Sequence, residues 1–201
     1  ARGESLRDIA EGISRCMIAL TILPLATIAL VGRDIFAVVF GAWWGEAGVY
    51  AAILVPLMFA MFLTACESLF DVLELQEKDL LFHGLFLIVK VGSLLLGGLW
   101  LKDVRIALLL FSITASLAYA FRAWYILSAA GASMLRVVFS LRGHFIAAVP
   151  ALTVIAIAKW WAKLPSIWLL FVVAVTFVPY YIYLIRRDMY LRQAVSQIAG
   201  S

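Results

Sequence analysis

Residues 166–185 read SIWLLFVVAVTFVPYYIYLI and contain no charged side chain. A helix of about 20 apolar residues, rising about 1.5 Å per residue, is long enough to cross the hydrocarbon core of a bilayer. Pro165 precedes this run, and Arg186 and Arg187 follow it directly. The segment therefore predicts a membrane-spanning helix with sharp polar limits.

Five further runs of the same kind precede this one. We place the spans near residues 9–31, 47–70, 80–101, 105–127, 144–161 and 166–185. Hydrophobic residues make up 66% of the chain and charged residues 14%, against about 45–50% and about 25% in soluble domains. Runs this long favour helices over the roughly 10-residue alternating strands of a membrane barrel. We therefore predict an all-α, polytopic membrane protein, with residues 1–201 forming a single six-helix bundle.

The connections between the spans are short and polar. We expect Pro24 to kink the first span and Gly32-Arg33-Asp34 to end it, because charges are costly in hydrocarbon. The apolar piece 35–40 is too short to cross and either lies at the interface or extends the helix. An acidic turn over 71–79 follows the second span, and an amphipathic piece over 135–141 precedes the fifth.

The basic residues predict which way the chain is oriented. Six spans place both termini on one side, and that side holds Arg2, Arg7, Lys78, Arg136, Arg142, Arg186, Arg187 and Arg192. The opposite side holds Arg33, Lys102, Arg105, Lys159 and Lys163. The positive-inside rule then places both termini in the cytoplasm. Tryptophans near the expected outer ends fit an interfacial aromatic belt; these are Trp43, Trp44, Trp100, Trp160 and Trp161.

Four ionisable side chains fall inside the spans and are functional candidates, because such groups are costly in hydrocarbon. They are Arg15, Glu67, Lys90 and Arg122. Arg122 is near the inner end of its span and can alternatively extend to the headgroups. Arg15 follows Glu11 by one helical turn, so an ion pair between them is the structural alternative.

Glu67 and Lys90 lie on consecutive antiparallel spans at depths that differ by only about 5 Å. One interpretation is a structural ion pair between them. The other is that both face a hydrated cavity, where Lys90 meets a substrate anion and Glu67 sets its charge state or takes part in proton coupling. The sequence leaves both interpretations open.

Enzymatic signals are weak. Ser133 and His144 are the material for an intramembrane serine protease, but Ser133 lies in a loop with no second glycine to build a tight turn. No metal-ligand spacing and no phosphate-binding loop occurs, so we expect no catalytic residue, metal or cofactor. Cys16 and Cys66 fall in apolar runs and suit small core positions. Basic residues in such a chain mostly set orientation and do not indicate nucleic-acid binding.

The segment after the first span reads GRDIFAVVFGAWWGEAG over residues 32–48, followed by ILVP over 53–56. It resembles the entry to the eighth helix in bacterial oligosaccharide flippases, the polysaccharide exporter branch of the multidrug/oligosaccharidyl-lipid/polysaccharide superfamily. The matching residues are Phe40, Gly41, Trp44, Ala47, Gly48 and Pro56. The six spans then correspond to the second half of that fold.

The resemblance implies transport of undecaprenyl-pyrophosphate-linked oligosaccharide across the bacterial inner membrane by alternating access between two six-helix lobes. This chain would supply the C-terminal lobe, and the resemblance implies an N-terminal lobe outside it. The sequence starts at Ala1 without an initiating Met, so we expect a fragment or a processed product. Expected partners are membrane lipid, the lipid-linked oligosaccharide, that N-terminal lobe, and a glycan polymerase or glycosyltransferases. Family members line the cavity with cations, and on local grounds we nominate Arg15, Lys90 and Arg122 with Glu67 for substrate binding.

Two other functions stay open. A multidrug-type exporter of small molecules could share the same fold, and lost drug tolerance in a deletion strain would identify it. A membrane scaffold for glycan-assembly enzymes would move nothing in vesicles.

Overall fold

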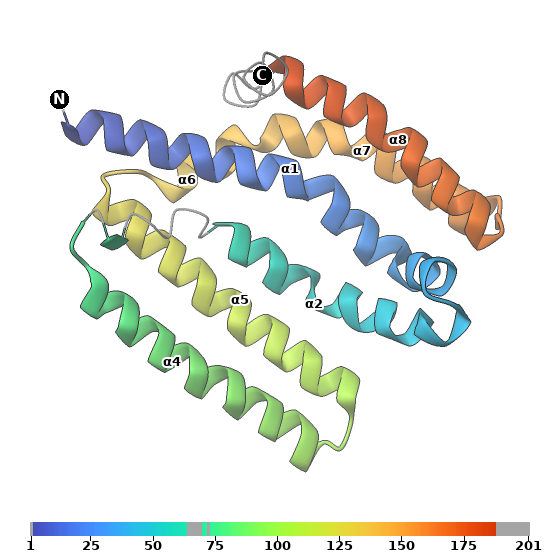
Figure 1. Cartoon of the computed structure of the whole chain (residues 1–201), viewed down its shortest axis with the longest axis horizontal. Coiled ribbons are helices and arrows are strands. Elements are labelled where there is room, and N and C mark those ends of the chain that lie inside the picture. Colours follow the sequence, from blue (N-terminus) through green and yellow to red (C-terminus); the bar gives the residue numbers. More distant parts are fainter. Residues whose placement is uncertain (1, 64–69, 72, 188–201) are drawn as a thin grey trace. The chain divides into compact units, whose positions relative to one another are not determined.

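The computed structural model describes residues 2–63, 70–71 and 73–187, and every regular element among them is a helix (Figure 1). The elements are α1 (Arg2–Val39), η1 (Ala42–Trp44), α2 (Gly45–Leu63), α4 (Gln76–Leu95), η2 (Leu96–Trp100), α5 (Val104–Ala129), α6 (Met134–Ser140), α7 (Arg142–Ala156), η3 (Ile157–Trp161) and α8 (Ser166–Arg187).

Six of these segments are long and apolar enough to cross a membrane. They cover Ala10–Val39, Ala42–Leu63, Gln76–Trp100, Val104–Ala129, Arg142–Trp161 and Ser166–Arg187. The prediction of an all-α, polytopic membrane protein is therefore confirmed, and most boundaries agree with the predicted spans to within a few residues. The amphipathic piece predicted over 135–141 forms the short helix α6.

The predicted break after residue 31 takes the form of a bend, and of the two alternatives given for residues 35–40 the structure shows the helical extension. Helix α1 continues to Val39, and its backbone departs from helical geometry within the helix at Val31, where φ is −130° and ψ is 17°. The apolar piece after Asp34 thus extends the helix beyond a bend. Asp34 is tolerated there because it is paired with Lys159 at 3.0 Å. The pair lowers the cost of keeping the Asp34 carboxylate in a helix between apolar segments.

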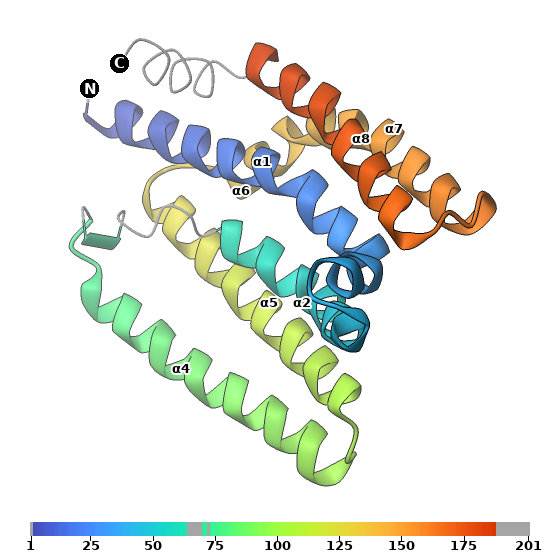
Figure 2. The ribbon, with the colours of Figure 1, turned by 45° about the vertical axis from the view of Figure 1, so that its right-hand side comes forward.

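The chain divides into two compact units. Unit 1 comprises residues 1–17 and 53–139, and unit 2 comprises residues 18–52 and 140–201. Each unit contains one antiparallel pair of long helices, α4 with α5 in unit 1 and α7 with α8 in unit 2, and each pair lies side by side in both views (Figures 1 and 2).

Unit 1 is packed around the α4–α5 pair. At the end nearest the connecting turn, the helices approach so closely that a Cβ atom on Gly97 would overlap the backbone of Ala107. Towards the other end, larger residues separate them, and aromatic rings pack against one another there. One buried cluster of this unit contains Leu57, Ala60, Phe86, Ala115 and Tyr119.

Unit 2 is packed around the α7–α8 pair and the part of α1 that contains the bend. Val31 is 1% exposed and belongs to the buried core, together with Ile155, Ala158, Leu169 and Val173. Immediately after the bend, α1 meets α2 through two glycines: a Cβ atom on Gly32 would lie 2.8 Å from the carbonyl oxygen of Gly48. The absence of side chains at both positions permits this close approach.

The turns of the two hairpins are built alike. In each, the first long helix ends in a π-helical turn, η2 or η3, and a lysine in the left-handed region follows: Lys102 with φ 51° and Lys163 with φ 46°. The residue two before each lysine is a highly exposed tryptophan, Trp100 at 83% and Trp161 at 85%. We call the end of each unit that carries this turn its tryptophan end.

Candidate functional site

Lys90 lies in α4, well inside the third span, and is half-buried. Its ammonium donates a hydrogen bond to the hydroxyl of Tyr119 in α5 at 3.1 Å and sits 5.0 Å from the centre of the same ring. The ring of Tyr119 in turn packs against Phe86 with centroids 5.0 Å apart. The cation is therefore held by one aromatic residue through both a hydrogen bond and a cation–π contact.

Arg122, three residues after Tyr119, has a different environment. Its side chain is 1% exposed, its Nη2 atom lies 2.6 Å from Oδ1 of Asp79, and its Nε atom donates to the same oxygen at 3.2 Å. The guanidinium carbon also lies 4.8 Å from the centre of the Phe70 ring. Arg122 thus forms a buried ion pair and does not extend to solvent.

The two cations differ in how their charge is compensated. A carboxylate neutralises Arg122, whereas within the described ranges the partner of Lys90 is a neutral hydroxyl. An anion gains more from meeting an uncompensated cation in a medium of low dielectric constant than from meeting one already paired. Of the nominated residues, Lys90 is therefore the one best suited to bind an anionic group.

Glu67 and Arg15, the other nominated residues, give less evidence for an anion-binding site. Glu67 lies outside the described residues, so its predicted relation to Lys90 has no structural outcome. Arg15 is half-buried in α1. Glu11, one helical turn before it, forms ion pairs with Arg7 at 3.4 Å and Arg136 at 3.5 Å and accepts a hydrogen bond from the backbone amide of Ser133 at 3.2 Å.

The residues that carry the family resemblance shape the entry to α2. Gly41 has φ 106°, a conformation that side chains rarely adopt, and it precedes the short helix η1. The rings of Phe40 and Trp44 lie across this turn with centroids 5.9 Å apart. Gly48 permits the contact with α1 described above, Ala47 is half-buried beside it, and Pro56 lies inside α2.

A second polar cluster, which sequence reasoning missed, lies in unit 2. Lys159 of η3 pairs with Asp34 at 3.0 Å and donates a hydrogen bond to the carbonyl oxygen of Leu30 at 2.7 Å. Ser166, the first residue of α8, donates to the other carboxylate oxygen of Asp34 at 3.2 Å. The sequence places Asp34 in a helix break and Lys159 among the basic residues of the outer side, and no local signal joins them.

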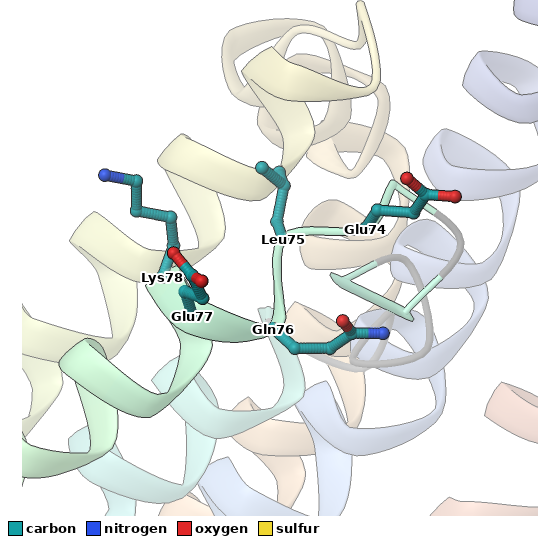
Figure 3. A pocket seen from close by; sticks show the side chains of 5 residues that line it. All are labelled: Glu74, Leu75, Gln76, Glu77 and Lys78. Carbon is teal, nitrogen blue, oxygen red and sulfur yellow. The ribbon is translucent and has the colours of Figure 1, made fainter.

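An open pocket of about 520 Å³ lies at the segment that leads into α4, lined by residues 74–78 (Figure 3). The side chains of Glu74 and Gln76 extend to one side of it, and that of Lys78 extends to the other. Two of its five lining side chains are carboxylates, Glu74 and Glu77, which makes it a poor site for an anion such as pyrophosphate. Lys90 lies about 20 Å further along α4, at 1.5 Å per residue.

Metal binding finds no support in the part of the chain that the structure describes, where no three His, Cys, Asp or Glu side chains are grouped closely enough to hold an ion. Comparison with known proteins adds no relative: no family model, no curated protein and no solved structure matches this chain.

Proposed function

We propose that this chain is one lobe of a membrane exporter that moves lipid-linked oligosaccharide across the bacterial inner membrane. Two features support the proposal. The segment over residues 40–56 resembles that of oligosaccharide flippases, and six helices in the described part of the chain are long and apolar enough to span the bilayer, as one lobe of such an exporter requires.

Lys90 is the observation that carries the proposal. A pyrophosphate with its sugars cannot cross about 30 Å of hydrocarbon without a polar path. An ammonium inside a spanning helix, held by Tyr119 and uncompensated by any described carboxylate, supplies attraction for such an anion. Lysine has three donor hydrogens, so Lys90 can keep its bond to Tyr119 and still donate to a phosphate oxygen.

The same geometry suggests how the anion would be released. The hydroxyl of Tyr119 accepts a hydrogen bond from Lys90 at 3.1 Å with no anion bound. Tyr119 keeps the ammonium in place. After the anion leaves, its hydroxyl still accepts a hydrogen bond from the ammonium, so the cation is not left unsolvated. Binding is then moderate, as a transporter that must release its cargo requires.

Export of surface glycan in a strain that lacks the native gene tests the proposal. Complementation with Lys90→Ala should give much less surface glycan than the parent protein, and Lys90→Arg should restore part of it because the charge is kept. Lys78→Ala is the matched control, since Lys78 is an exposed cation of the same helix. Export at the parent level by Lys90→Ala at equal protein abundance would contradict the proposed role of Lys90.

One observation favours the scaffold function as the second candidate. The two best-defined cations, Arg122 and Lys159, are both compensated by carboxylates of the same unit, as a purely structural bundle would require. A scaffold would tolerate Lys90→Ala, whereas a deletion of the whole chain would still reduce surface glycan. The pair of phenotypes therefore separates the two functions.

A further inference from the structure

The bend of α1 at Val31 is not at a proline, although Gly32 follows it directly. Sharp bends in helices arise at proline, at glycine or serine pairs, at π-bulges, or where a side chain enters the backbone hydrogen-bond ladder. Pro24 is two turns earlier, and the residue with non-helical backbone is a valine. A side chain does enter the ladder here: the ammonium of Lys159 donates to the carbonyl oxygen of Leu30, the residue directly before the bend, at 2.7 Å.

The same ammonium holds the other side of the bend. Asp34, one turn beyond Leu30, lies 3.0 Å from Lys159 through Oδ2, and its Oδ1 atom accepts a hydrogen bond from Ser166 at 3.2 Å. One cation thus bridges the two segments of α1, and the carboxylate extends the link to the start of α8. We call Lys159, Asp34 and Ser166 the clasp.

Packing around the clasp holds the bent segment on its other faces. Val31 is buried against the α7–α8 core, and Gly32 meets the backbone of Gly48 in α2. The clasp itself is less enclosed, with side-chain exposures of 27% for Lys159 and 26% for Asp34. The polar contacts that shape the bend are therefore accessible, whereas the apolar contacts beneath it are not.

We propose that the clasp is a releasable lock on a hinge at Val31. A bend made by proline is permanent, because the missing amide and the ring clash are covalent properties of the helix. A bend held by a tertiary ion pair lasts only while the pair is made. Closed, the clasp holds the segment Gly32–Val39 against the start of α8; open, it lets that segment realign with the rest of α1.

The proposal concerns unit 2 alone and does not depend on what the protein transports. It is tested by distance measurement between spin labels on the purified full chain in lipid nanodiscs. Labels at Val38→Cys in α1 and Ile167→Cys in α8 are both on exposed positions. Both labels are introduced into a protein that carries Cys16→Ser and Cys66→Ser, so that no native thiol is labelled.

Lys159→Met keeps most of the aliphatic stem and removes the ammonium. We expect a second, longer distance population in this variant and the parent distribution in Lys163→Met, a control that changes an exposed lysine in the turn that follows. A single population that matches the parent in Lys159→Met would overturn the proposal.

Hydrogen exchange of the backbone amides over residues 30–36 provides a second readout. Asp34→Asn keeps the shape of the side chain without its charge, and loss of a charge-assisted contact should raise exchange about tenfold. Ser166→Ala removes a single hydrogen bond and should give a smaller rise in exchange. It serves as the test if Lys159→Met or Asp34→Asn fails to fold. Exchange at the parent rate in the folded variants would overturn the lock.

Discussion

The Nη2 atom of Arg122 lies 2.6 Å from Oδ1 of Asp79, and the arginine side chain is 1% exposed. This pair joins the C-terminal part of α5 to the first turn of α4, next to the ring of Phe70. Removing one partner of a buried pair leaves a charge without compensation, which costs more than removing both. The Arg122–Asp79 pair therefore fixes how α4 is placed against α5.

Asp79→Asn is expected to destabilise the protein by up to about 3 kcal/mol, because Asp79, itself 28% exposed, no longer neutralises the buried guanidinium of Arg122. The double variant Asp79→Asn/Arg122→Met should recover part of that loss. The midpoint of thermal unfolding in detergent measures both, with Asp71→Asn as the control, since Asp71 is exposed in the same connection. A double variant less stable than Asp79→Asn alone would contradict this account of the pair.

Gly97→Ala should destabilise unit 1 by about 1–3 kcal/mol, because its new Cβ atom would overlap the backbone of Ala107 and no rotamer can relieve that overlap. Gly92→Ala is the matched control: it lies on the same helix, and no atom lies within 4 Å of an added Cβ atom. This control should be neutral or slightly stabilising, because alanine favours helix. Equal unfolding midpoints for the two variants would show that the helices are not in close contact at Gly97.

Tyr119→Phe keeps the ring beneath Lys90 and removes the hydroxyl that accepts its hydrogen bond. We expect a stability loss of about 1 kcal/mol and a fall in glycan export smaller than that of Lys90→Ala. Tyr125→Phe serves as the control, because the ring of Tyr125 packs on Phe82 in the same hairpin. Parent-level stability and export in Tyr119→Phe would show that the hydroxyl does not position Lys90.

The proposed orientation predicts a labelling pattern in intact cells. In a background of Cys16→Ser and Cys66→Ser, a membrane-impermeant thiol reagent should modify Lys102→Cys and Ala162→Cys, which are exposed at the tryptophan ends. It should modify Gln76→Cys and Ala129→Cys, exposed at the opposite end of α4 and α5, only after the cells are permeabilised. The reverse pattern would place both termini outside the cytoplasm.

Most of the fold follows from hydropathy, because each span is a local property of about 20 residues. The predicted span 166–185 and the observed helix Ser166–Arg187 agree closely, and so do 105–127 and Val104–Ala129. The continuation of α1 to Val39 could not be predicted from hydropathy, because two adjacent charged residues such as Arg33 and Asp34 also occur at the ends of spans. Asp34 is paired by Lys159, which is 125 positions away along the chain, and hydropathy cannot represent such a partner.

The candidate site was predictable as a set of residues but not as a set of pairs. The cost of charge in hydrocarbon singled out Lys90 and Arg122 as candidates. Their partners, Tyr119 and Asp79, depend on the register between α4 and α5, which the close contact at Gly97 fixes in three dimensions.

Movement of a fluorescent lipid-linked oligosaccharide in liposomes that contain the purified full-length protein tests the proposed function most directly. A membrane-impermeant quencher added outside should progressively reach substrate that starts in the inner leaflet, and Lys90→Ala should slow this about tenfold or more. Quenching that stops at the outer-leaflet fraction, as in protein-free liposomes, would contradict the proposal that this protein moves such lipids.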